Sequence, residues 1–174
     1  MKHRLTAALG LAVLLAGCTF ELPYRAHLGT GLPEYTGTDI DGKPISTADF
    51  KGKIVVVVTE MLDDHFDVIQ SLAKLHADSA KVSFLAAAAT NNVTSARPTL
   101  LKLRATLGLQ NWTLIADDDL RFVNALGADS RSVVLLYNLQ GKLVVETGAF
   151  GNIYCTQTQL DLLVQGKAPQ SESC

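Results

Sequence analysis

The sequence lacks the clustered basic residues and aromatic platforms with which proteins bind nucleic acid. Aromatic residues make up 6% of the 174 residues, and 17 Asp and Glu outnumber 15 Lys and Arg. No internal repeat or low-complexity tract is present. Because 48% of the residues are hydrophobic and 18% are charged, the composition is that of a globular protein and not of a disordered one. We therefore expect no nucleic-acid partner.

The N-terminal apolar run is too short to span a membrane. Leu5–Ala16 contains about twelve apolar residues, whereas a spanning helix needs roughly twenty. With Lys2 and Arg4 before it, the run has the layout of a secretory signal. The string "LLAGC" at its end resembles a bacterial lipobox. This resemblance implies cleavage before Cys18 and its modification by several palmitate-type acyl chains, which would anchor the protein firmly to a membrane.

The lipobox also implies a domain organisation and a location. We expect a signal peptide at residues 1–17, the lipidated cysteine with a Gly- and Pro-containing tether at 18–33, one domain at 34–166 and a tail at 167–174. The anchor would hold the protein in the bacterial cell envelope, facing the periplasm. Thr19 in place of an aspartate directly after the lipidated cysteine favours the outer membrane.

Cysteine is scarce, with three residues in the whole chain. Once Cys18 is lipidated, Cys155 and Cys174 remain, and an exported protein usually oxidises such a pair. The favoured interpretation is a structural disulfide that pins the polar tail to the domain. Two alternatives stay open. The pair could be a labile redox couple, with the Cys155 thiol activated by a helix N-terminus, or the thiols could be free or intermolecular.

The apolar pattern alternates strands with helices. A hairpin turn is expected at Asp41–Gly42. Buried strands are expected at 55–58, 82–89 and 112–115, and two more around a turn at 138–141. Helices are expected at 64–79, from Thr94 or Ser95 to Gly108, at 120–126, and from a capping box of Thr156 and Gln159 to Gly166. This order predicts an α/β fold with a mixed central sheet flanked by helices, parallel in its first half and antiparallel at its end.

This order and three local strings resemble the thioredoxin-like redoxins. The strings are "DIDGKPISTADFKGKIVVVV", "SARPTLLKLRATLGLQNWTLI" and "SVVLLYNLQGKLVV". They are similar above all to the SCO (SenC) copper-delivery proteins and the TlpA-type thiol oxidoreductases. The resemblance covers about residues 35–166 and implies a thioredoxin-like fold.

The reactive residues of those families have no counterparts here. The SCO proteins bind copper through Cys-x-x-x-Cys after the first core strand and a distant histidine, and Asp63 and Asp67 stand at the two cysteine positions. A TlpA-type Cys-x-x-Cys would fall on Asp63 and Phe66. The distant histidine falls near Ser130, and the cis-proline of thioredoxins falls near Ser132. Because disulfide exchange needs a thiolate and Cu(I) prefers sulfur ligands, we expect neither reaction at this junction.

Asp63, His65 and Asp67 form a weak candidate site for a hard or borderline metal ion. Asp63 and Asp67 would share one face of a helix, whereas His65 would point elsewhere unless it lies in the preceding loop. The favoured interpretation is that Asp63 or Asp64 caps the helix. The string "ADDDL" at 116–120 lacks the ligand spacing of a calcium loop and is interpreted as a turn into a capped helix. No cofactor beyond this metal ion is predicted.

The function that these features favour is non-enzymatic. We expect a binding or accessory module with a protein partner in the cell envelope, in envelope or respiratory-complex assembly. Two alternatives remain: a thiol-disulfide oxidoreductase that uses Cys155 and Cys174, and a metal-binding protein that uses Asp63, His65 and Asp67.

Overall fold

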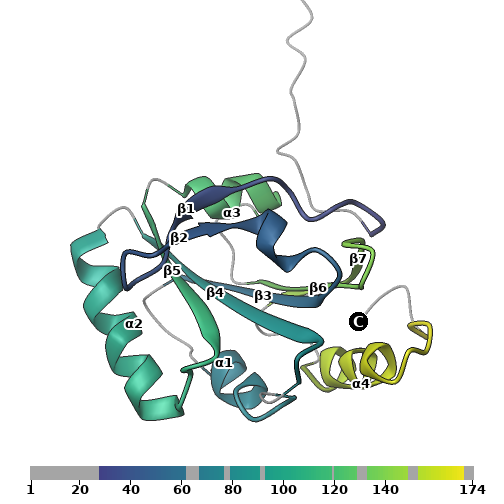
Figure 1. Cartoon of the computed structure of the whole chain (residues 1–174). Coiled ribbons are helices and arrows are strands. Elements are labelled where there is room, and N and C mark those ends of the chain that lie inside the picture. The colour runs from purple at the N-terminus through teal and green to yellow at the C-terminus, as the bar shows by residue number, and fades with distance from the viewer. Residues whose placement is uncertain are drawn as a thin grey trace, which may run out of the picture.

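A five-stranded sheet lies at the centre of the molecule, with helices on both of its faces (Figure 1). The structure is a computed structural model that describes residues 28–61, 67–76, 79–90, 93–118, 120–128, 133–148 and 153–170. The strands of the sheet are β3 (Ile54–Met61), β4 (Val82–Thr90), β5 (Trp112–Asp118), β6 (Val133–Tyr137) and β7 (Leu143–Gly148). Two short strands, β1 (Thr36–Thr38) and β2 (Pro44–Ser46), form a separate hairpin. The helices are η1 (Thr47–Phe50, a 3-10 helix), α1 (Asp67–Leu72), α2 (Val93–Leu107), α3 (Arg121–Leu126) and α4 (Ile153–Val164).

The sheet is mixed, with the parallel first half and antiparallel end that the sequence predicts. The strand order is β5-β4-β3-β6-β7. Strands β3, β4 and β5 are parallel, whereas β6 and β7 run antiparallel. All six residues from Ile54 to Thr59 are buried, as expected of a central strand covered on both faces. The α/β fold with a mixed central sheet is thus confirmed.

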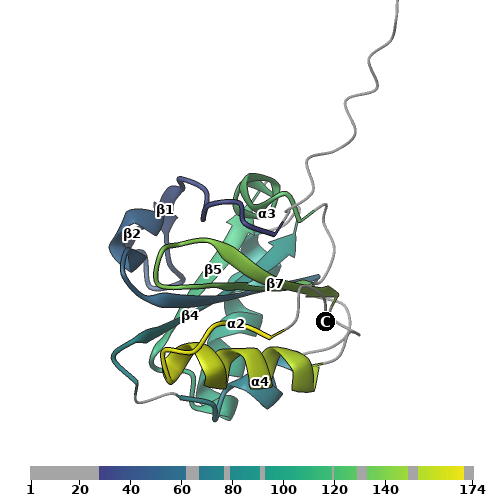
Figure 2. The same ribbon diagram turned by 90° about the vertical axis from the view of Figure 1, so that its right-hand side faces the viewer.

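The sheet separates two apolar layers. Val56 of β3 and Leu100 of α2 belong to one layer, which also includes residues of α1 and α4. Val57 of β3 and Phe122 of α3 belong to the other. Successive side chains of a strand point to opposite faces, so one strand supplies both layers. Figures 1 and 2 show the same division, with α1, α2 and α4 on one side of the sheet and α3 with the β1–β2 hairpin on the other.

The β1–β2 hairpin turns at the predicted Asp41–Gly42. Asp39 Oδ1 accepts hydrogen bonds from the backbone N–H groups of Asp41 and Lys43, each at 2.8 Å. Gly42 has φ +80°, a conformation that glycine adopts at little cost. The Asp41 carboxylate receives two hydrogen bonds from the Arg104 guanidinium, at 2.7 and 3.0 Å. The tip of the hairpin is therefore held against α2.

Residues Gly29 to Leu32 belong to the folded domain. Gly29 N–H donates to the Leu143 carbonyl at 2.7 Å, and Leu143 N–H donates to the Thr30 carbonyl at 2.8 Å. Leu32 N–H donates to the Gly141 carbonyl at 2.8 Å. Part of the segment expected to be tether thus pairs its backbone groups with the outer edge of β7 and with the turn before it. Local composition does not report such long-range pairing.

Two predicted helices have different bounds in the structure. The helix expected at 64–79 ends at Leu72, and His76 has a left-handed φ of +47°. The His76 ring contacts the Asp161 carboxylate of α4 at 2.6 Å. The apolar spacing continues past Leu72, but the chain has to turn back toward β4. Helix α2 starts at Val93, before both predicted capping residues, and ends at the predicted Gly108.

Candidate functional site

The junction between β3 and α1 is the site that the sequence singles out. Asp63, His65 and Phe66 lie outside the described residues, as do Ser130 and Ser132. Asp67 is the first residue of α1, and only its backbone is described. The metal site and the assignment of former cysteine positions therefore stay predictions. Among the described residues, no three His, Cys, Asp or Glu side chains are grouped to hold a metal ion.

Cys155 occupies the first turn of α4, as its third residue, and is half-buried. Its sulfur is disulfide-bonded. Its partner is one of the two other cysteines, Cys18 and Cys174, and both lie outside the described part of the chain. Pairing with Cys174 therefore stays a prediction. Because Cys155 is inside the helix and not before it, the predicted placement ahead of a capping box is wrong.

The predicted capping box of Thr156 and Gln159 does not exist. Both residues lie within α4 and are buried, at 0% and 4% exposure. The Gln159 amide oxygen accepts a hydrogen bond from Gln170 N–H at 2.9 Å, so it holds the segment after the helix. The Thr-x-x-Gln pattern is local, whereas tertiary packing placed both side chains on the inner face of the helix. The helix does end at the predicted Gly166, where Lys167 N–H donates to the Leu162 carbonyl.

A buried carboxylate lies at the carboxyl end of the parallel strands. Asp117 of β5 is 1% exposed, and its two oxygens accept hydrogen bonds from the N–H groups of Phe122 and Val123, both at 2.8 Å. It thus satisfies two of the free donors at the start of α3. The interpretation of "ADDDL" as a turn into a capped helix is therefore right only in part. Ala116 to Asp118 belong to β5, and Leu120 at the N-cap position has no side-chain cap, but Asp117 accepts hydrogen bonds from the first turn of α3. The sequence analysis named the string but did not single out this residue.

Tyr35 lines the same cavity as Asp117. Its ring packs on Phe122, with ring centroids 4.7 Å apart. Burial and the Asp117 carboxylate raise the pKa of the Tyr35 hydroxyl, and the Arg121 guanidinium opposes this shift. Tyr35, Asp117 and Arg121 line a polar cavity of about 570 Å³, which we call the Asp117 cavity. Since both Asp117 oxygens already bind backbone N–H groups, this carboxylate has a structural role.

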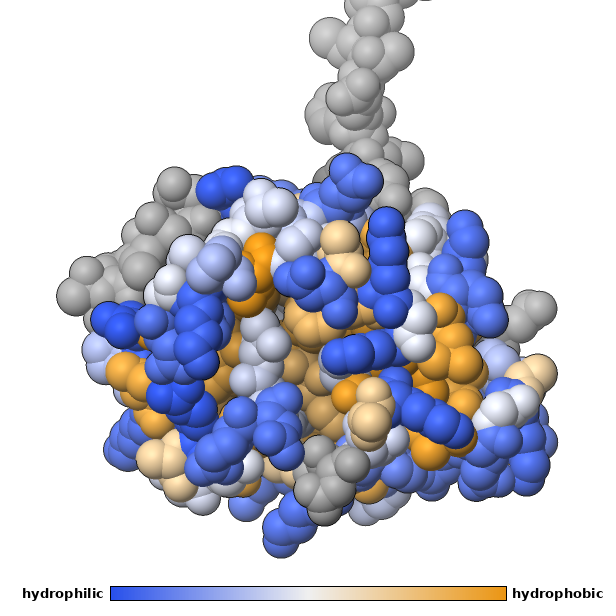
Figure 3. All heavy atoms as spheres, viewed as in Figure 1, coloured by the Kyte–Doolittle hydropathy of each residue, from blue (hydrophilic) through white to orange (hydrophobic). Residues whose placement is uncertain are grey.

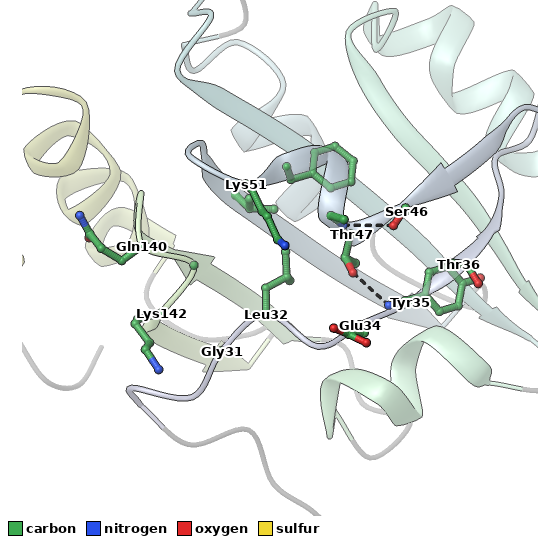
Figure 4. Close-up of a pocket in the computed structure, with 14 residues that line it drawn as sticks. Gly31, Leu32, Glu34, Tyr35, Thr36, Ser46, Thr47, Lys51, Gln140 and Lys142 are labelled. Carbon is green, nitrogen blue, oxygen red and sulfur yellow. Dashed lines mark hydrogen bonds between the residues drawn. The ribbon is translucent and has the colours of Figure 1, made fainter.

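Tyr35 also lines a second cavity, of about 460 Å³, which we call the η1 cavity (Figure 4). It lies between the N-terminal segment, η1 and the β6–β7 turn, and its apolar lining includes Leu32, Phe50 and Val55. Lys51 and Lys142 also line it. On the face that carries β1 and β2, apolar atoms are exposed between hydrophilic side chains (Figure 3). The sequence analysis missed this cavity because three segments far apart in the chain form it.

Comparisons with known proteins show the fold. No protein-family model matches the sequence, and no curated protein does either. A putative protein disulfide isomerase from Bacteroides thetaiotaomicron has a TM-score of 0.66 at 18% identity, over 83% of this chain and 94% of that one. A putative thioredoxin from Neisseria meningitidis has a TM-score of 0.63 at 19% identity, over 79% and 91%. A SCO1/SenC family lipoprotein from Bacillus anthracis has a TM-score of 0.61 at 18% identity, over 79% and 96%. The fold is therefore thioredoxin-like, as the sequence resemblance implies.

None of the helices in the described part of the chain has the length and apolar character needed to cross a membrane.

Proposed function

We propose that this protein is a lipid-anchored envelope protein whose thioredoxin-like domain binds a protein partner and does not exchange disulfides. The observation that carries the proposal is the absence of any cysteine between Cys18 and Cys155. This interval includes the whole junction between β3 and α1. A carboxylate cannot replace the thiolate nucleophile or the resolving thiol, and carboxylates are poor ligands for Cu(I). A fold does not preserve a function whose site residues are missing.

The location is proposed from the N-terminal sequence. "LLAGC" supports lipidation of Cys18 and exposure to the periplasm, and Thr19 favours the outer membrane. One protein with a similar fold is itself a lipoprotein. By resemblance to the SCO proteins, we place the partner in envelope or respiratory-complex assembly.

The alternative function is a thiol-disulfide oxidoreductase that uses Cys155 and Cys174. The observation in its favour is that Cys155 lies in the first turn of α4, where the helix N-terminus stabilises a thiolate. A redox titration of the full chain, with thiols trapped by alkylation and read by mass, separates the two functions. A potential below about -300 mV is typical of a structural disulfide, whereas about -120 to -270 mV is the range of working oxidoreductases.

A turnover assay on a model disulfide gives the direct test. We expect no exchange above the uncatalysed rate for the wild-type chain. The double variant Asp63→Cys/Phe66→Cys restores a Cys-x-x-Cys at the junction and serves as the positive control. Turnover by the wild type that Cys155→Ser abolishes would establish the alternative function and refute the proposed one.

The partner can be sought in the native envelope by photo-crosslinking. We expect a defined adduct that persists in Cys155→Ser, because binding would not depend on the thiols. An adduct that disappears with the thiols would contradict the proposal.

The metal alternative predicts that Asp63→Ala lowers metal affinity while the fold stays intact. Loss of a helix cap alone would instead lower stability by about 1 kcal/mol.

A further inference from the structure

Two of the hydroxyl groups that line the η1 cavity already form hydrogen bonds within the protein. Thr47 Oγ1 donates to the Pro33 carbonyl at 2.7 Å and accepts from Tyr35 N–H at 2.9 Å. Ser46 Oγ accepts from Ala48 N–H at 3.2 Å. Apolar atoms, including those of Leu32 and Phe50, make up the larger part of the exposed lining. A ligand would therefore be bound mainly through apolar contact.

The rim of the cavity carries a surplus of positive charge. Lys51 follows η1 and Lys142 precedes β7, so two separate elements supply the cations, whereas Glu34 is the single acidic lining residue. Within the described part of the chain, none of these three side chains forms an ion pair. In Figure 4, Lys51 projects from the end of η1 toward the N-terminal segment that carries Leu32, and Lys142 lies on the β6–β7 turn. An anionic group at the rim would therefore lie near positive charge, where charge-assisted hydrogen bonds form.

Two exposed leucines neighbour, in sequence, the segments around the cavity. Leu28 and Leu139 are 44% and 40% exposed. Leu28 precedes Gly29, which pairs with β7, and Leu139 lies in the β6–β7 turn next to Gln140, which lines the cavity. The cavity volume of about 460 Å³ lies within the roughly 300–1,000 Å³ of small-molecule sites.

We propose that the η1 cavity binds an amphipathic anion: an aliphatic chain that contacts Leu32, Phe50 and Val55, with one carboxylate or phosphate group held by Lys51 and Lys142. The site is distinct from the β3–α1 junction and from Cys155. Its ligand is independent of whether the protein has thiol chemistry.

The probes are dodecanoate, dodecyl phosphate and the uncharged dodecanol, each titrated below its micelle concentration into the full chain. Calorimetry gives the affinity, and amide chemical shifts locate the site. We expect saturable binding of at least one anion, with shifts confined to residues 31–36, 46–51 and 140–142. Preference for dodecanoate indicates a free fatty acid, and preference for dodecyl phosphate indicates a phosphate-bearing lipid. Equal binding of dodecanol, or no saturable binding of either anion, refutes the proposal.

Two matched variants test the assignment. Lys51→Gln/Lys142→Gln is expected to weaken binding of the anion roughly tenfold, the effect of losing two partly exposed charge pairs. Lys81→Gln/Lys102→Gln makes the same change in net charge at residues that do not line the cavity, and should leave the affinity unchanged. If both pairs weaken binding equally, the attraction is nonspecific and the proposed site is wrong.

A steric variant probes the apolar part without altering the rim charges. Ala48 is exposed on η1 and lines the cavity. Ala48→Trp therefore places an indole at the cavity without touching the buried core, and is expected to abolish binding while the melting temperature stays near the wild-type value. Unchanged affinity in this variant would refute the assignment to this cavity.

Discussion

Removal of the buried Asp117 carboxylate should lower the free energy of unfolding. Asp117→Ala leaves the N–H groups of Phe122 and Val123 without their acceptor. A buried donor left unsatisfied costs about 1–3 kcal/mol. The adjacent cavity allows water to replace part of this bonding, so we expect a loss of about 2–4 kcal/mol. Asp117→Asn keeps one acceptor oxygen and should lose about 1–2 kcal/mol.

Urea unfolding provides the assay. The chain has one tryptophan, Trp112, which is 7% exposed and stacks on Phe84 with centroids 4.8 Å apart. Its fluorescence should therefore report global unfolding. Asp49→Asn is the matched control, because Asp49 accepts a hydrogen bond from Ser46 N–H at an exposed helix start. We expect it to cost less than about 1 kcal/mol.

The variant Asp117→Asn also tests the electrostatics of Tyr35. The Asp117 charge is one of the two causes that raise the pKa of Tyr35, so Asp117→Asn should lower that pKa while burial keeps it above the ordinary 10.0. A folded-state pKa above the unfolded value means that Tyr35 contributes stability below pH 10, which is lost as pH rises through the raised pKa. Tyrosinate absorbance measures the shift. An Asp117→Ala loss below about 1 kcal/mol would refute the capping argument, and an unchanged Tyr35 pKa in Asp117→Asn would refute the electrostatic one.

Three further outcomes are expected. Arg104→Gln should raise the pKa of Asp41, which the Arg104 hydrogen bonds hold below its ordinary value, and carboxyl NMR titration measures this pKa. The stability advantage of the wild type over this variant should be full above the ordinary carboxyl pKa. It should vanish as pH falls through the lowered pKa of Asp41. Gly37→Ala should cost about 1–3 kcal/mol in urea unfolding, because a Cβ there would collide with the Tyr35 hydroxyl and ring; a neutral result would contradict the packing described. Leu100→Ala should cost about 2–5 kcal/mol, because this side chain is 1% exposed in the layer beneath the sheet; a loss under 1 kcal/mol would show that the layer closes the space.

The central strands could be predicted because their signal is local. A continuous apolar run is stable as a strand when both faces are covered, and this describes the four valines of β3 and the mainly apolar β4. Gly108 and Gly166 ended their helices where the sequence places them, because both adopt the left-handed φ that favours glycine. These features depend on a residue and its immediate neighbours.

The helix starts and the site were less accessible to sequence analysis. Thr156 and Gln159 match a capping pattern, yet they are buried in the middle of α4. The apolar spacing after Leu72 continues the helical period, yet the helix ends there. In both cases the preference of a local pattern is about 1 kcal/mol or less, so tertiary packing overrides it.

The sequence by itself determined the α/β class, the strand order along the chain, and the absence of the cysteines that the redoxin resemblance would require between Cys18 and Cys155. Composition and residue identity are sufficient for each of these. Only the tertiary structure decided that Gly29 to Leu32 pair with β7, that Asp117 caps α3 beside Tyr35, and that Leu32, Phe50 and Lys142 surround one cavity. These groups come from segments far apart in the chain that meet only when the sheet and the β1–β2 hairpin pack together. Local sequence patterns do not predict contacts between such distant segments.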